Sequence, residues 1–110
     1  MNALALAVLA ALQLSLAAEP PVEPDPRDKG PDKIDVSSYP PEQKARYPLY
    51  EQKCAKCHPL ARSINSRFTS AEWKRYMKRM ARRPNAGVTD EQTQDIYEFL
   101  KYYSSTLGLQ

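Results

Sequence analysis

Both cysteines and the only histidine of this 110-residue chain fall within five consecutive positions, as Cys54, Cys57 and His58 of the stretch KCAKCHPLAR. A chain of this length forms at most one small domain. Ten prolines and only two phenylalanines leave few large side chains for an apolar core. This cluster of reactive side chains therefore restricts the fold, because a domain with so thin a core has to be built around whatever the cluster holds.

Charge is distributed unevenly along the chain. Residues 19–42 carry seven acidic and three basic side chains, residues 44–83 carry two acidic and twelve basic, and residues 84–110 carry four acidic and one basic. The modest net charge of +3 therefore conceals a middle block of net charge +10 that surrounds the Cys/His cluster. Such a block attracts an anionic partner or balances an anionic ligand.

The first 17 residues predict a signal peptide. The run MNALALAVLAALQLSLAA is apolar, ends in small residues that suit cleavage before Ala18, and is shorter than the roughly 20 residues that span a bilayer. No lysine or arginine precedes the run, so an uncleaved anchor or a core helix stays open as the alternative. No cysteine stands at the cleavage point to carry a lipid. After cleavage we expect an exported, periplasmic chain without a transmembrane segment.

Residues 18–38 predict a semi-extended linker, because proline and charge dominate and few apolar side chains are available for burial. Residues 39–110 are then the folded domain. Its first predicted helix covers residues 40–57, with Pro41 in the first turn. Pro48 is expected to kink or restart this helix, because proline lacks the amide proton and clashes with the preceding turn.

Two further helices are predicted over residues 69–83 and 89–105. Thr69 with Glu72, and Thr89 with Gln92, fit capping boxes at their starts. Each helix has one apolar stripe, formed by Trp73, Tyr76, Met77 and Met80 in the first and by Ile96, Phe99, Leu100 and Tyr103 in the second. No stretch alternates as a strand does. The fold class is therefore all-α, with about three helices.

The spacing Cys-x-x-Cys-His is the attachment sequence of c-type haem, whose two vinyl groups accept the two thiols while the histidine is directed at the iron. Zinc sites normally take four protein ligands, and only three are present. A redox-active Cys-x-x-Cys is expected beside strands, which are absent from the pattern. A Cys54–Cys57 disulfide closes almost no loop and leaves His58 unexplained. A catalytic Cys-His pair rarely has a second cysteine three residues away.

From about Tyr39 to Thr106 the chain resembles a small monohaem cytochrome c domain. The resemblance rests on CAKCH, on the aromatic helix before it and on the closing helix IYEFLKYY. It implies a small domain whose helices pack around one covalently bound haem c, with Cys54 and Cys57 attached to the haem and His58 as proximal iron ligand. It also implies that the first and last helices cross, with Tyr50 against Ile96, Tyr97 or Leu100.

The second axial iron ligand is predicted to be Met80, with Met77 as second choice. No second histidine exists, and after signal cleavage only these two methionines remain. Cytochromes of this kind use a thioether sulfur, which raises the reduction potential. Met80 lies near the helix end and seven residues after Trp73, similar to small bacterial cytochromes. Only 22 residues separate it from His58, a shorter distance than usual. The methionine that is not the ligand packs in the core.

The expected function is periplasmic transfer of single electrons between redox partners, as a free carrier or as a subunit of a larger oxidoreductase or photosynthetic complex, and not enzymatic catalysis. The alternative is a five-coordinate haem that binds a small gas or activates peroxide. Partners are expected to be proteins with an acidic docking surface, not nucleic acid. The docking residues would be Lys74, Arg75, Lys78, Arg79, Arg82 and Arg83, which otherwise form a solvated face. Arg62 and Arg67 would pair with a haem propionate or lie free on the surface.

Overall fold

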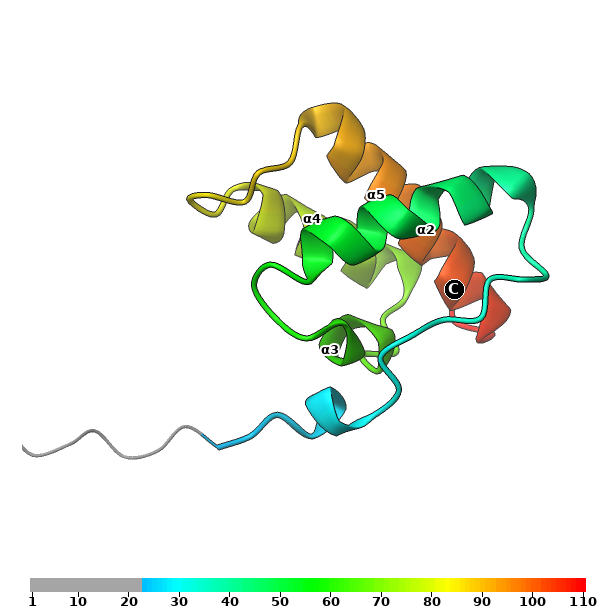
Figure 1. Cartoon of the computed structure of the whole chain (residues 1–110), viewed down its shortest axis with the longest axis horizontal. Coiled ribbons are helices and arrows are strands. Elements are labelled where there is room, and N and C mark those ends of the chain that lie inside the picture. The colour runs from blue at the N-terminus through cyan, green and yellow to red at the C-terminus, as the bar shows by residue number, and fades with distance from the viewer. Residues whose placement is uncertain (1–22) are drawn as a thin grey trace, which may run out of the picture.

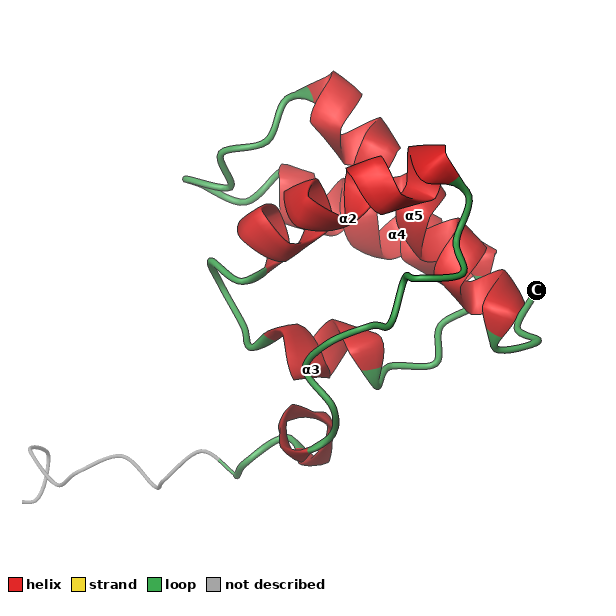
Figure 2. Cartoon of the chain, turned by 45° about the vertical axis from the view of Figure 1, so that its right-hand side comes forward, coloured by secondary structure: helices red, strands yellow, loops and turns green. Residues whose placement is uncertain are grey.

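The structure, a computed structural model, describes residues 23–110; the predicted signal peptide lies outside the described residues. This part of the chain is helical and contains no strand, which confirms the all-α prediction (Figure 2). It has four α-helices rather than about three: α2 (Pro41–Cys54), α3 (Leu60–Ile64), α4 (Ser70–Ala81) and α5 (Asp90–Thr106). A 3-10 helix, η1 (Pro26–Lys29), precedes them. No helix in this range is long and apolar enough to cross a membrane.

Helices α4 and α5 begin where the capping boxes predict. In each, the threonine hydroxyl accepts the backbone N–H three residues on, and the Glu72 or Gln92 side chain accepts the threonine N–H in return. These reciprocal bonds satisfy amide groups that have no partner inside the helix. The register of both helices is fixed at these threonines, which decides which side chains face inward.

Pro48 was expected to kink or restart the first helix; α2 runs unbroken through Pro48, so the restart is wrong. The missing amide of Pro48 deprives the Lys44 carbonyl of its usual partner. Both residues have exposed side chains, so this carbonyl lies on the side where water can solvate it. Tyr47 and Tyr50 pack on the opposite side and hold both halves of the helix against the same core.

The predicted first helix also ends three residues early, at Cys54. Pro59 disfavours a helical conformation in the residue before it, which is His58. Residues 55–58 therefore form a turn, and Pro59 caps the short helix α3. The two cysteines are consequently separated in structure, with Cys54 on the helix and Cys57 in the turn.

The core lies where α5 crosses α2 on one side and α4 on the other (Figure 1). Phe99 stands at the centre of the first crossing, with its ring 5.2 Å from that of Tyr50 and 5.4 Å from that of Tyr47. The expected contact of the first and last helices is confirmed. The aromatic partner of Tyr50 on α5 is Phe99, whereas Ile96 and Leu100, which were expected against Tyr50, belong to the same buried cluster, and Tyr97 packs against that cluster half-buried.

Residues 25–36, part of the segment interpreted as a linker, pack against the helical domain. Helix η1 lies against α3, below it in Figure 1. Further along, the backbone N–H of Ile34 donates to the Tyr47 hydroxyl at 2.9 Å. We call residues 25–36 the N-terminal arm.

Candidate functional site

All five residues that the sequence singled out for haem attachment and iron ligation line one cavity. The cavity is partly open to solvent, and its empty space, including the part open to solvent, is about 490 Å³. Four segments form its wall: the end of α2 with the following turn, the second half of α4, the loop after it, and α5. The residues are Lys53, Cys54, Cys57, His58, Tyr76, Met77, Met80, Ala81, Ala86, Val88 and Ile96.

The two cysteines face different environments. Cys54 packs against the core cluster, and burial together with the neighbouring Cys57 raises the pKa of its thiol to about 12. Cys57 is exposed in the turn, and the two thiols are not joined in a disulfide. A thiol with so high a pKa stays protonated near neutrality and is a poor catalytic thiolate. The cavity is therefore lined by one half-buried and one exposed cysteine.

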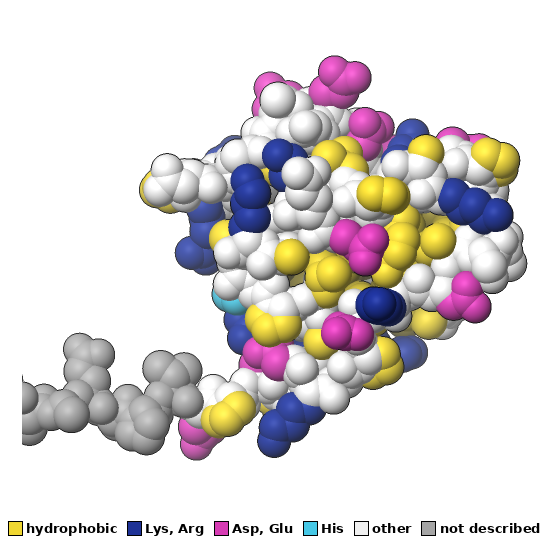
Figure 3. Space-filling view, viewed as in Figure 1, with side chains coloured by type: hydrophobic (Ala, Val, Ile, Leu, Met, Phe, Trp, Pro, Cys, Tyr) yellow, Lys and Arg dark blue, Asp and Glu magenta, His cyan; other side chains and the backbone are white. Residues whose placement is uncertain are grey.

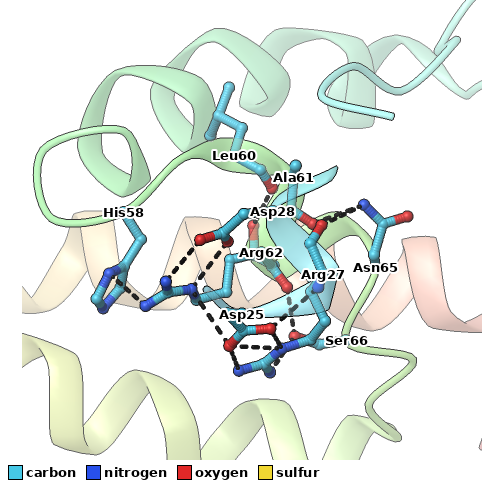
Figure 4. Close-up of polar contacts among 10 residues, drawn as sticks. Asp25, Arg27, Asp28, His58, Leu60, Ala61, Arg62, Asn65 and Ser66 are labelled. Carbon is cyan, nitrogen blue, oxygen red and sulfur yellow. Dashed lines mark hydrogen bonds and ion pairs between the residues drawn. The ribbon is translucent and has the colours of Figure 1, made fainter. Parts of the chain in front are cut away.

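His58 is held through one ring nitrogen. Nη1 of Arg62 lies 2.7 Å from Nδ1 of His58, and because a guanidinium has no acceptor, Arg62 is the donor (Figure 4). Arg62 in turn donates to both carboxylate oxygens of Asp28, at 2.7 and 3.0 Å. Nε2 has no hydrogen-bond partner among the described residues, so it is the ring nitrogen left for a ligand in the cavity.

The two methionines occupy different positions on α4. Met77 is only 5% exposed and belongs to the core cluster with Trp73 and Ile96. Met80 is half-buried and lies next to the last residue of the helix. Both reach the cavity wall, but only Met80 combines that position with a side chain free of the core.

Aromatic contacts fix Tyr76, which carries the only hydroxyl among the described residues that line the cavity. Its ring meets Trp73 edge-on at 5.4 Å and Phe68 at 5.9 Å. Burial raises the pKa of the Tyr76 phenol, so it stays protonated and uncharged. The wall is thereby apolar apart from Lys53, His58 and this hydroxyl.

The loop between α4 and α5 closes one side of the cavity with Ala86 and Val88. Nζ of Lys53 donates to the Gly87 carbonyl at 2.8 Å and ties the loop to the end of α2. Gly87 has φ +67°, and a Cβ there would lie 2.7 Å from Nζ of Lys56, so this position favours glycine.

Sequence reasoning missed Asp25 and Asp28, which reach the site from the N-terminal arm, and the wall residues after Pro84. The turn signature Asp25-Pro26 and the glycine at position 30 were the available hints of structure in the arm. Arg62 does lie beside the site, paired with Asp28, whereas Arg67 is exposed and does not line the cavity.

Within residues 23–110, no group of three or more His, Cys, Asp and Glu side chains is arranged to hold a metal ion by itself, so the geometry gives the zinc alternative no support. Comparison with protein-family models, with curated proteins and with solved structures found no significant match.

Proposed function

We propose that this chain is a small c-type cytochrome that carries single electrons outside the cytoplasm. One observation carries the proposal: Cys54, Cys57 and His58, whose spacing is that of haem attachment, line the same cavity as Met77 and Met80. These residues come from α2, the following turn and α4. Sequence spacing alone cannot bring Met80 to the cysteines.

The cavity fits such a group in its chemistry. Its wall is largely apolar, with both thiols and one imidazole facing the same space. Iron would be held by Nε2 of His58, the ring nitrogen that has no hydrogen-bond partner among the described residues. When bound, haem iron supplies one-electron redox chemistry.

Met80 is the second axial ligand in this proposal. The thioether of Met80 can reorient because its side chain is half-buried and stands at a helix end. Met77 would have to leave the core cluster, which would lose buried apolar contacts. A thioether ligand favours ferrous iron and suits a carrier that accepts and releases electrons reversibly.

We expect haem to remain on the polypeptide after denaturation and extraction with acidified organic solvent. The measurement is the absorbance of the precipitated protein, made after expression together with a haem-attachment system. Replacing Cys54 and Cys57 with alanine should release all haem to the solvent, because no thioether bond remains. Replacing the exposed Ala55 with serine leaves both thiols and is the control. Complete loss of haem from the unmutated protein would refute the proposal.

The proposed partner is a redox protein with an acidic docking surface. Lysine and arginine side chains gather beside the histidine in Figure 3. The basic residues of α4 are exposed, and the Arg79 guanidinium stands 5.8 Å above the ring of Tyr76, which lines the cavity. This basic face therefore reaches the edge of the site, where it would steer an anionic partner.

Steering predicts a salt-dependent reaction rate. The rate of oxidation by an anionic reagent such as ferricyanide should fall as salt is added, because the Debye length shrinks from ~10 Å at about 0.1 M to ~3 Å at about 1 M. Reversing Lys78 and Arg79 to glutamate should slow oxidation at low salt and have little effect at high salt. The control reverses Lys44 and Lys101, exposed lysines on other helices. Equal effects of both pairs at all salt concentrations would contradict steering by this face.

A further inference from the structure

The N-terminal arm is fastened to the domain by specific polar contacts. Nη1 of Arg27 donates to the Ser66 hydroxyl at 3.0 Å. Nδ2 of Asn65 donates to the carbonyls of Arg27 and Pro31, at 3.1 and 3.0 Å. A Cβ on Gly30 would lie 2.4 Å from this same amide nitrogen, so the backbone approaches Asn65 more closely than any other residue would allow. The arm is thus seated in one register on α3.

In this position the arm places the carboxylates of Asp25 and Asp28 against Arg62, the arginine that donates to His58. Asp28 accepts two hydrogen bonds from Arg62, and Asp25 lies 3.6 Å from the same guanidinium (Figure 4). Asp25 also accepts from Nε and Nη2 of Arg27, at 3.0 and 2.6 Å. Hydrogen bonds from these arginines hold the pKa values of both carboxyls below their usual range, so both are ionised near neutral pH.

The cluster is therefore balanced: two carboxylates from the arm face two guanidiniums, and one guanidinium touches His58. The contacts are only partly exposed, so water screens them less than it screens charges on the open surface. Asp32 and Asp35 lie further along the same arm, are exposed, and make no contact with either arginine. Of these four carboxylates, only those of Asp25 and Asp28 contact the arginines beside His58.

We propose that the N-terminal arm tunes the haem site, with Asp25 and Asp28 as positioning residues that hold Arg62 against His58 and cancel the charge of both arginines. This inference rests on the proposed function for its redox consequence. Ferrous iron carries one positive charge fewer than ferric iron, so an uncompensated positive charge beside the iron ligand favours the ferrous state. The arm therefore keeps the reduction potential lower than the two arginines alone would set it.

The test is a redox titration of the full-length, haem-loaded protein. In the double variant Asp25→Asn, Asp28→Asn, shape is kept and two negative charges are lost, so the midpoint potential should rise. The matched control is Asp32→Asn, Asp35→Asn, which removes the same charge from the same segment and should shift the potential much less. Equal shifts in the two variants, or a shift only in the control, would overturn the inference.

A second measurement follows the arm without haem. His58 is the only histidine, so its ring nitrogens give unambiguous ¹⁵N resonances in the full-length chain prepared without haem. In the unmutated protein and in the control, Nδ1 should resonate as an acceptor and Nε2 as a protonated nitrogen. Asp25→Asn, Asp28→Asn should free Arg62 and average the two signals. Unchanged signals would contradict the positioning role.

Failure of the proposed function and failure of the inference about the arm give different results. If no haem is attached to the polypeptide, the proposed function is refuted, while the ¹⁵N spectra still decide whether the arm positions His58. If haem is attached and a redox couple is measured, the comparison of the two double variants decides the role of the arm alone.

Discussion

Met80→Ala should open the iron to external ligands. Once the thioether is removed, the far-red sulfur-to-iron charge-transfer band of the ferric form should vanish, and carbon monoxide should bind the ferrous form readily. The midpoint potential should fall, because a soft thioether no longer favours ferrous iron. Absorbance spectra with and without carbon monoxide, together with a redox titration, measure all three changes in one preparation.

The matched variant is Met77→Ala on the same helix. Met77 is 5% exposed and packs in the core cluster, so its truncation should keep the charge-transfer band and cost about 2–5 kcal/mol of unfolding free energy. The reverse pattern would assign the ligand to Met77. If the unmutated protein binds carbon monoxide readily and shows no sulfur band, the carrier proposal fails in favour of a five-coordinate, ligand-binding haem.

The helices that the sequence predicted best are those whose ends carry local chemistry. Thr69 with Glu72, and Thr89 with Gln92, satisfy backbone amides within one turn, so their effect does not depend on the rest of the fold. The stripes behind them were identified from periodicity, and Trp73, Phe99 and Leu100 are indeed fully buried. Where local signals and burial agree, the sequence alone is sufficient.

Features that depend on tertiary contacts were not predictable in this way. Pro48 was expected to kink or restart the helix because its local effect is unfavourable, but the helix does not restart, and Tyr47 and Tyr50 on either side of Pro48 pack into the same core. The N-terminal arm looked like a linker because it is rich in proline and charge. Its order comes from polar contacts such as Arg62 with Asp28, which are 34 positions apart in the chain.

The residues of the candidate site likewise fall into those that the sequence predicted and those that depend on tertiary packing. The spacing of Cys54, Cys57 and His58 carries its own chemistry and could be interpreted without a structure. That Met77 and Met80 reach the same cavity depends on how α4 packs against α5, which no spacing reveals. Ala86 and Val88 line the cavity because the hydrogen bond from Lys53 to the Gly87 carbonyl fixes their loop. Neither Lys53 nor Gly87 belongs to a recognisable sequence motif.

The packing of α4 rests on Trp73, which therefore connects the core to the site. Its side chain is 1% exposed, and its ring meets Phe68 edge-on at 4.8 Å. Its indole N–H donates to the Ser104 hydroxyl at 2.8 Å, and that hydroxyl donates to the Phe68 carbonyl at 2.7 Å. One side chain thus joins α4, α5 and the segment between α3 and α4.

Trp73→Ala should consequently lower the free energy of unfolding of the haem-loaded protein by about 3–5 kcal/mol, the usual cost of deleting a large buried aromatic side chain. Denaturation must be followed by far-ultraviolet circular dichroism, because Trp73 is the only tryptophan and the variant lacks its fluorescence. Trp73→Phe keeps a ring but no N–H, so it should lose less. Arg75→Ala, at an exposed position of the same helix, should stay within about 0.5 kcal/mol of the unmutated protein. A Trp73→Ala loss no larger than that of Arg75→Ala would mean that α4 is held in place by the haem and not by the protein core.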